Sequence, residues 1–408
     1  MSHQRTGSAL LTTLLAQSIG STAVFAPTVV APLIAAAMGL PVAAVGLYIS
    51  AVYVGAMVSS VLSGPVIIAV GGTRVSQWSL LACCLGLLFV SSSLAAFGLL
   101  GALIIGLGYG PLTPASSDVL IRATSPRRMS LVYSIKQTGV PLGGVIAGAV
   151  LPVLALAMDW NWGLAIVGLV CVACALVIAP FRSALDGERS GAVRRPGILD
   201  VLEPVRFTLR DPSLRILAMV SFVFSATQVS LTAYLVTFLT QDLHWLLVAA
   251  GLALSVSQAA SVFGRVLWGW VADTWVGSRR TLVLLASAMA ASALSVLALD
   301  ASTPHWLVVL LMALFGATAV GWNGVFLAAV ARLSPPGQTA VVTGGTLAFT
   351  YLGVVVGPLL FGVFATGAGG FAIAFALLAL PLSLCLVLIL RLVNDGRPAT
   401  SAGGSRRA

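Results

Sequence analysis

Two cationic side chains lie within long apolar segments, where a charge is costly and usually marks a pathway or a partner. Lys136, the only lysine, is about 9 Å inside a segment that starts near residue 130, at a rise of roughly 1.5 Å per residue. Arg265 is roughly 12 Å inside the segment that ends near Asp273. No Asp or Glu occupies the middle of any apolar segment. Because a cavity with excess positive charge selects anions, this pattern predicts a site for a small organic anion such as a carboxylate.

Two alternatives remain open for these cations. Lys136 precedes the midpoint of its segment, so its amine could extend to the membrane interface instead. Arg265 could instead complete a structural network with Asp273, at the end of the same segment.

Other polar residues in apolar segments are candidates for the same cavity, although such side chains more often hydrogen-bond locally than bind a substrate. The predicted set is Gln17, Gln137, Gln228, Gln258, Asn323, Tyr109 and Tyr351. Asp118 and Arg122 are four positions apart, and they are candidates for proton coupling, with a structural ion pair as the alternative.

The elements that must position these side chains are membrane-spanning helices. Of the 408 residues, 59% are hydrophobic and 8% are charged, against about 25% charged in soluble domains. Residues 6–73 and 333–390 contain no Asp, Glu, Lys or Arg. Because a helix needs about 20 apolar residues to cross a bilayer, each stretch holds two crossings. The composition therefore predicts a polytopic membrane protein and excludes soluble, collagen-like, disordered and disulfide-rich classes.

Turn residues divide the chain into twelve predicted helices. They span residues 9–37, 42–70, 77–97, 99–123, 130–156, 162–181, 214–240, 246–273, 281–299, 306–332, 339–366 and 370–391. Arginines gather in every second gap, the positive-inside pattern, which places both termini in the cytoplasm of a bacterial-type plasma membrane. The net charge of +10 therefore indicates topology rather than nucleic-acid binding. The first apolar segment runs past a signal-peptide-like stretch, so we expect an uncleaved first helix.

A mixed-charge segment, residues 182–213, separates two sets of six helices, 1–181 and 214–391, and a tail, 392–408, follows. We expect the segment to be a cytoplasmic linker with an amphipathic helix near 198–209. The halves resemble each other, since the polar stripe of the first helix recurs in the seventh. With an offset of 210, Arg122 falls on Arg332. Repeated halves with a site between them are a transporter design.

The most specific local motif follows the eighth predicted helix. It consists of Gly269, Asp273, Gly277, Arg279 and Arg280. This pattern resembles the short cytoplasmic loop motif of the major facilitator superfamily. The first half carries a degenerate copy with Gly64 and Arg74, in which Ile68 replaces the acid. The resemblance covers essentially the whole chain and implies two pseudo-symmetric six-helix bundles, with a loop that stabilises the outward-facing state by pairing across the halves.

The fifth predicted helix contains Gly139 and Pro141 shortly after Lys136. Small residues allow close helix packing, and proline introduces a kink. This helix looks like the Gly- and Pro-rich fifth helix of major facilitator exchangers, which bends during alternating access. The pair Gly264-Arg265 also resembles the eighth helix of organic-anion and monocarboxylate members.

The sequence is thus identified as an all-α secondary active transporter of the major facilitator superfamily, for a small organic anion, with proton coupling as an option. Alternatives are an efflux antiporter for drugs or metabolites and a transporter-like membrane sensor or scaffold. Residues 75–117 carry no charge, which disfavours multidrug–proton antiport. All three histidines lie outside the predicted helices, which disfavours an enzyme. We expect no cofactor, metal site or nucleic-acid partner; the expected partners are a small-molecule substrate and membrane lipid, and the expected state is a monomer.

Overall fold

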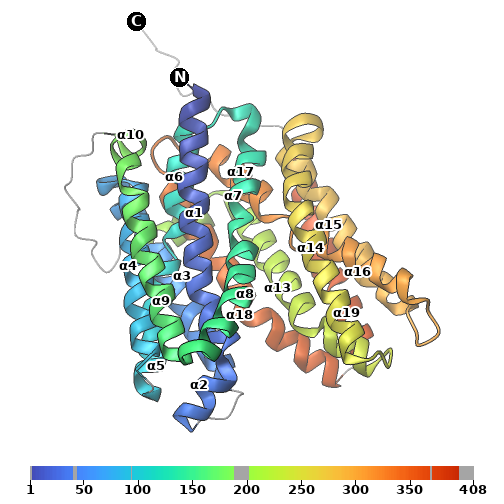
Figure 1. Cartoon of the computed structure of the whole chain (residues 1–408). Helices are drawn as coiled ribbons and strands as arrows, with labels where there is room; N and C mark the ends of the chain where they lie inside the picture. Colours follow the sequence, from blue (N-terminus) through green and yellow to red (C-terminus); the bar gives the residue numbers. More distant parts are fainter. Residues whose placement is uncertain (1, 40–43, 93, 188–201, 368–369, 395–408) are drawn as a thin grey trace, which may run out of the picture.

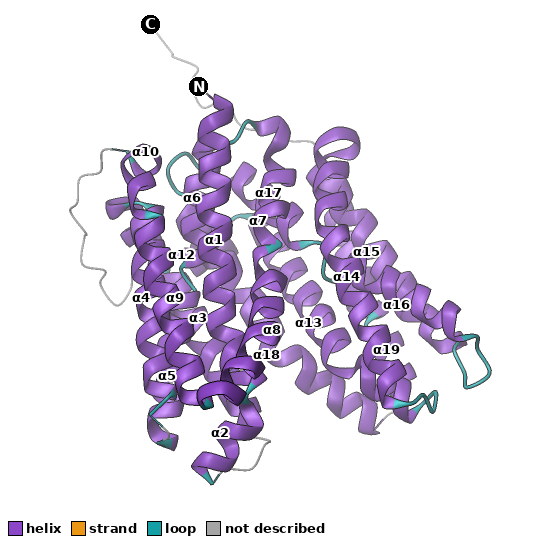
Figure 2. Cartoon of the chain, viewed as in Figure 1, coloured by secondary structure: helices purple, strands orange, loops and turns teal. Residues whose placement is uncertain are grey.

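The computed structural model describes residues 2–39, 44–92, 94–187, 202–367 and 370–394. These residues form helices and connecting turns, without strands (Figures 1 and 2). Eleven helical stretches among them are long and apolar enough to cross a membrane. One of these, Leu252–Ala298, is 47 residues long and is divided where Gly277 takes a φ of 80°, so it contains two crossings. The prediction of twelve membrane helices is confirmed.

The N-terminal half is built from ten α-helices and two short 3₁₀ turns within the described residues. They are α1 (Ser2–Val29), α2 (Ala31–Met38), α3 (Ala44–Val70), α4 (Gly72–Val90), α5 (Ala95–Tyr109), α6 (Leu112–Ala123), η1 (Pro126–Arg128), α7 (Met129–Gln137), α8 (Gly139–Met158), α9 (Trp160–Val177), η2 (Ala179–Phe181) and α10 (Arg182–Asp186).

The C-terminal half follows a short helix that belongs to the predicted linker. The elements are α12 (Glu203–Arg210), α13 (Pro212–Gln241), α14 (Leu247–Val271), the π-helical turn η3 (Ala272–Val276), α15 (Gly277–Ser295), η4 (Val296–Ala298), α16 (His305–Ala319), α17 (Asn323–Leu333), α18 (Thr339–Gly367), α19 (Phe371–Leu377) and α20 (Ala379–Asn394). The predicted amphipathic helix appears as α12, where Pro204 and Thr208 are buried and pack against Gly345 of α18. Residues 188–201 of the linker lie outside the described residues.

Several predicted helices are broken where the backbone loses a donor. The fourth predicted helix is two, α5 and α6, separated at Gly110 and Pro111, and the fifth is divided at Thr138, three residues before Pro141. Proline has no N–H, so the regular hydrogen bond to the carbonyl four residues earlier is absent. The first helix begins at Ser2 rather than at residue 9, and α13 begins at Pro212 because Asp211 caps it. The Asp211 carboxylate accepts the backbone N–H groups of Ser213 and Leu214, at 2.8 and 2.9 Å.

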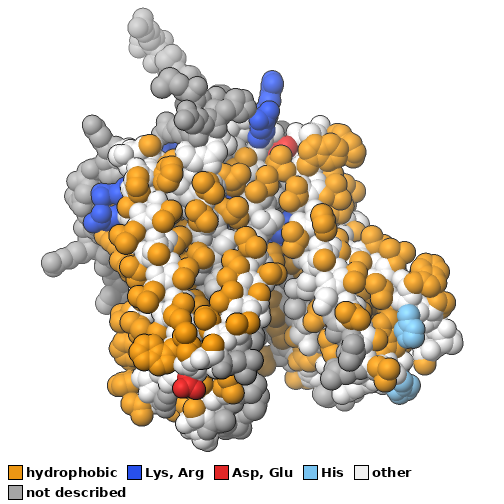
Figure 3. Space-filling view, in the orientation of Figure 1, with side chains coloured by type: hydrophobic (Ala, Val, Ile, Leu, Met, Phe, Trp, Pro, Cys, Tyr) orange, Lys and Arg blue, Asp and Glu red, His pale blue; other side chains and the backbone are white. Residues whose placement is uncertain are grey.

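The two halves touch along what we call the seam, where α7 packs against α14 and α17, and α3 packs against α18. One end of the molecule holds the start of α1 together with η1 and η3, and we call it the closed end. The other end holds α2 and the loop Asp300–Thr303, and we call it the open end (Figure 1). Figure 3 shows a notch between the two bundles at the open end.

Glycines allow the close approach at the seam. A Cβ atom on Gly64 would lie 2.8 Å from the Cα of Val341, and one on Gly269 would lie 2.6 Å from the Cβ of Ser134. Real Cβ atoms do not approach this closely, because interiors are packed to near van der Waals contact. The first glycine of each copy of the predicted loop motif, Gly64 or Gly269, therefore lies between the halves, near the closed end.

Candidate functional site

Lys136 points into the protein and not toward a membrane interface, because only 1% of its surface is exposed. Its Nζ donates to Gln17 Oε1 at 2.7 Å, to Gln137 Oε1 at 3.1 Å and to Thr113 Oγ1 at 3.5 Å. These partners come from α1, α6 and α7, and all are uncharged. The alternative in which Lys136 extends to the interface is therefore wrong for this structure.

Arg265 reaches across the seam from α14, because Pro141 leaves an acceptor free. Pro141 cannot donate to the carbonyl of Gln137, and this carbonyl instead accepts Arg265 Nη1 at 2.8 Å. Arg265 is 2% exposed, and its buried Nε has no hydrogen-bond partner within the described chain. Arg265 and Lys136 both donate to Gln137, the first to its backbone carbonyl and the second to its side-chain oxygen. The alternative network of Arg265 with Asp273 does not form, since Asp273 has other partners.

Three tyrosines belong to one cluster, and one of them contacts the group around Lys136. Tyr53 and Tyr109 pack against a small buried cluster that contains Tyr351, and the rings of Tyr53 and Tyr351 are 6.1 Å apart. Gln17 Nε2 donates to the Tyr109 hydroxyl at 3.3 Å. Tyr109 therefore connects the tyrosine cluster to the group around Lys136.

A second polar cluster lies in the C-terminal half and repeats part of the first. Gln228 Oε1 accepts from Asn323 Nδ2 at 3.1 Å and from Trp322 Nε1 at 3.0 Å. In the other half Gln17 Oε1 accepts from Thr113 Oγ1 at 3.3 Å. The two halves thus share this contact, but no lysine accompanies it in the second cluster. Gln258 is half-buried on α14, and its carbonyl accepts from Ser261.

Asp273 fastens the halves together at the closed end. Its carboxylate accepts the backbone N–H groups of Ser130 and Leu131 at 3.1 and 2.7 Å, in the first turn of α7. Arg332 forms an ion pair with it at 2.9 Å and also donates to the Pro126 carbonyl at 3.0 Å. Sequence reasoning did not include Arg332, although its alignment with Arg122 between the halves was a signal.

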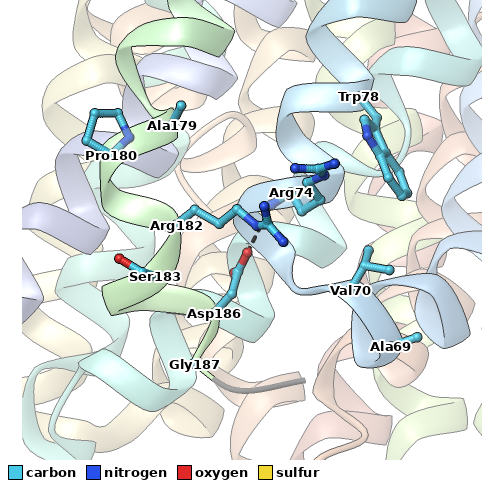
Figure 4. A pocket seen from close by; sticks show the side chains of 10 residues that line it. All are labelled: Ala69, Val70, Arg74, Trp78, Ala179, Pro180, Arg182, Ser183, Asp186 and Gly187. Carbon is cyan, nitrogen blue, oxygen red and sulfur yellow. Dashed lines mark hydrogen bonds between the residues drawn. The ribbon is translucent and has the colours of Figure 1, made fainter. Parts of the chain in front are cut away.

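An acid from the end of the N-terminal half caps the helix that follows the first loop, in which Ile68 occupies the acid position of the motif. Asp186, at the end of α10, accepts the backbone N–H groups of Thr73 and Arg74 at 2.9 and 3.1 Å (Figure 4). The first turn of α4 is therefore capped by a residue more than a hundred positions away. The Arg74 guanidinium lies over the Trp78 ring, 5.6 Å from its centroid.

The remaining predicted gating residues occupy turns and helix contacts. Gly277 turns the chain with a positive φ, and Arg279 Nη1 donates to the Leu392 carbonyl at 3.1 Å, which ties α15 to α20. Arg280 is exposed. Gly139 lies against Gln17 and Ser18 of α1, since a Cβ there would be 3.1 Å from each.

Asp118 and Arg122 form an ion pair on α6, near the closed end, with Asp118 buried. The five cysteines are buried and free. No three His, Cys, Asp or Glu side chains of the described chain are grouped as a metal site.

Known proteins are similar to this chain in sequence. The family model described as Major Facilitator Superfamily matches residues 12–346. An MFS-type efflux pump of Mycolicibacterium smegmatis is 27% identical over 271 residues, which cover 64% of this chain and 60% of the pump. A gentisate transporter of Corynebacterium glutamicum is 28% identical over 308 residues, which cover 71% of this chain and 66% of that protein. The chain therefore spans less than two thirds of the length of these relatives.

Solved structures share the fold. A human organic anion transporter has a TM-score of 0.74 at 19% identity, over 95% of this chain and 99% of its own. The Escherichia coli fucose:proton symporter has the same TM-score at 16% identity, over 94% and 97% of the two chains. At these identities the likeness establishes the architecture alone.

Proposed function

Because this chain belongs to the major facilitator superfamily, we propose that it carries a small organic anion across a membrane by alternating access. One observation carries the proposal: Lys136 of one half and Arg265 of the other meet at the seam, and their hydrogen-bond partners are neutral. Within the described chain, no carboxylate contacts either group. Removing unpaired charges from water costs several kcal/mol per ion, so a site of this kind is stabilised by an anion.

The position of the cations also gives the anion a role in the transport cycle. A carboxylate that binds the free Nε of Arg265 and the amine of Lys136 touches both halves at once. Its affinity then depends on how the halves are arranged, and a ligand shifts a conformational equilibrium only through such differential affinity.

An aromatic carboxylate fits the site better than an aliphatic one. Tyr109 contacts Gln17 of the group around Lys136 and packs in one cluster with Tyr53 and Tyr351, so aromatic rings adjoin the site. Stacked or edge-on aromatic contacts add to hydrophobic burial. The Corynebacterium glutamicum relative is named for gentisate, an organic anion. We therefore take an aromatic monocarboxylate as the substrate class.

Membrane sidedness follows from the arginines. With the closed end in the cytoplasm of a bacterial inner membrane, both termini are cytoplasmic and the notch of Figure 3 faces outward. Import, with Asp118 and Arg122 as candidates for proton coupling, is the first proposal. Efflux is the second, and the Mycolicibacterium smegmatis relative favours it.

Uptake into proteoliposomes tests the proposal. Radiolabelled gentisate, benzoate and succinate are compared with neutral benzyl alcohol, with and without a pH gradient of either sign. Lys136→Gln and Arg265→Gln should each weaken uptake by about tenfold or more, because each removes a charge-assisted hydrogen bond. Arg215→Gln is the matched control, since Arg215 is exposed on α13, away from the seam. Uptake that is unchanged in both seam variants would overturn the anion site, and transport only out of loaded vesicles would favour efflux.

A further inference from the structure

A cavity of about 620 Å³ lies on the N-terminal half, away from the seam. Figure 4 shows it between the end of α3, the first turns of α4, and the η2–α10 segment. In Figure 1, α4, α9 and α10 form the outer side of the N-terminal bundle, and α10 lies at the closed end. The transport mechanism proposed above does not use it.

The lining of this cavity carries more positive than negative charge. Its charged residues are Arg74, Arg182 and Asp186. The Asp186 carboxylate already accepts two backbone N–H groups of the α4 turn. Neither arginine forms an ion pair with another described residue. Two guanidinium groups that share a cavity are suited to a phosphate, because each presents a planar pair of donors to its oxygens.

An apolar face leads away from the charged end of the cavity. Trp78, which lines the cavity, is 44% exposed, and Leu81, Leu85 and Leu88 follow it at 45, 49 and 47%. Positions three and four apart lie on one face of a helix, so these side chains form one stripe along α4. In a membrane helix such a stripe faces acyl chains, and tryptophan is typical of the level where acyl chains meet head groups.

We propose that this cavity binds an anionic phospholipid, with the phosphate between Arg74 and Arg182 and an acyl chain along the Trp78–Leu88 stripe. A soluble phosphate compound matches the arginines but not the stripe, and a zwitterionic lipid matches the stripe but brings its own cation. The lipid would join the first turn of α4 to α10 at the start of the linker, since Arg74 belongs to the first and Arg182 to the second.

Native mass spectrometry of the delipidated protein tests this proposal. Phosphatidylglycerol should bind more tightly than phosphatidylcholine, and Arg182→Gln should weaken phosphatidylglycerol binding about fivefold, near the usual contribution of one basic residue at a lipid surface. The double variant Arg74→Gln/Arg182→Gln should weaken it further. Arg127→Gln is the matched control, because Arg127 is exposed in η1 at the same end of the molecule. Equal binding of both lipids, or an equal effect of Arg127→Gln and Arg182→Gln, would overturn the site.

Two further measurements identify the ligand and its position. Phosphatidylglycerol with brominated acyl chains should quench tryptophan fluorescence in the parent protein, and Trp78→Phe should remove a part of that quenching. Millimolar inorganic phosphate should not displace the lipid. Displacement by phosphate alone, or quenching that Trp78→Phe leaves unchanged, would contradict a lipid bound at this cavity.

Discussion

Asp273→Asn should open the closed end of the protein. The carboxylate accepts two backbone N–H groups of the other half, at 3.1 and 2.7 Å, and an ion pair from Arg332 at 2.9 Å. The Asp273 side chain is 5% exposed, whereas that of Arg332 is 31% exposed. The bonds to α7 therefore carry most of the effect, because an exposed ion pair contributes little.

The magnitude follows from the type of these bonds. Hydrogen bonds to a buried charged group contribute about 1.5–3 kcal/mol each, and an amide keeps one acceptor oxygen of the two. We take the net loss as about 2 kcal/mol. Since the bonds cross the seam, they are lost when the closed end opens, and the open population should rise about thirtyfold.

Thiol labelling measures this population. Ser134 is fully buried against Gly269 at the seam, so Ser134→Cys should react with a water-soluble maleimide only when the closed end opens. The five native cysteines are buried, and the parent protein gives their background. Asp273→Asn should raise the labelling rate of Ser134→Cys about thirtyfold.

The matched control is Asp300→Asn, because among the described residues Asp300 bonds only to its own loop at the open end. It should leave the labelling rate unchanged. If Asp273→Asn stays folded and labels within twofold of its parent, the cross-seam bonds do not hold the closed end, and the reasoning fails.

Three other substitutions test separate contacts. Gly64→Ala places a Cβ within 2.8 Å of Val341 and should favour opening of the closed end by about 1–3 kcal/mol, measured by the labelling rate of Ser134→Cys. Gly148→Ala is the control, because a Cβ there has nothing within 4 Å. Equal labelling rates in the two variants would contradict the seam packing. Pro141→Ala returns a backbone donor to the Gln137 carbonyl, which should displace Arg265 and raise the KM for the anion severalfold. Pro27→Ala in α1 is the control and should leave the KM unchanged. An unchanged KM in Pro141→Ala would refute the role of Pro141 in freeing this carbonyl for Arg265. Asp186→Asn weakens the cap of α4 by about 1 kcal/mol and should lower the Tm of thermal unfolding by about 2 °C. Asp159 is exposed, so the control Asp159→Asn should leave the Tm unchanged. Identical Tm values for the two variants would contradict the capping role of Asp186.

The sequence predicted the membrane helices well because insertion depends on local composition. Charge-free stretches such as 333–390 need no knowledge of their neighbours to be recognised. The positions at which helices are broken were predicted less accurately. Pro141 was expected to kink its helix, but the division at Thr138 and the release of the Gln137 carbonyl depend on where the chain packs.

The sequence by itself thus determined the class of protein, its twelve crossings and the presence of two intramembrane cations, with no acid in the middle of any apolar segment. The tertiary structure alone decided that Lys136 and Arg265 meet at Gln137, that Arg332 joins Asp273, and that Asp186 caps α4. The reason is physical: hydrophobic insertion is a sum over neighbouring residues, whereas a hydrogen bond between residues more than a hundred positions apart exists only once the helices that carry them have packed.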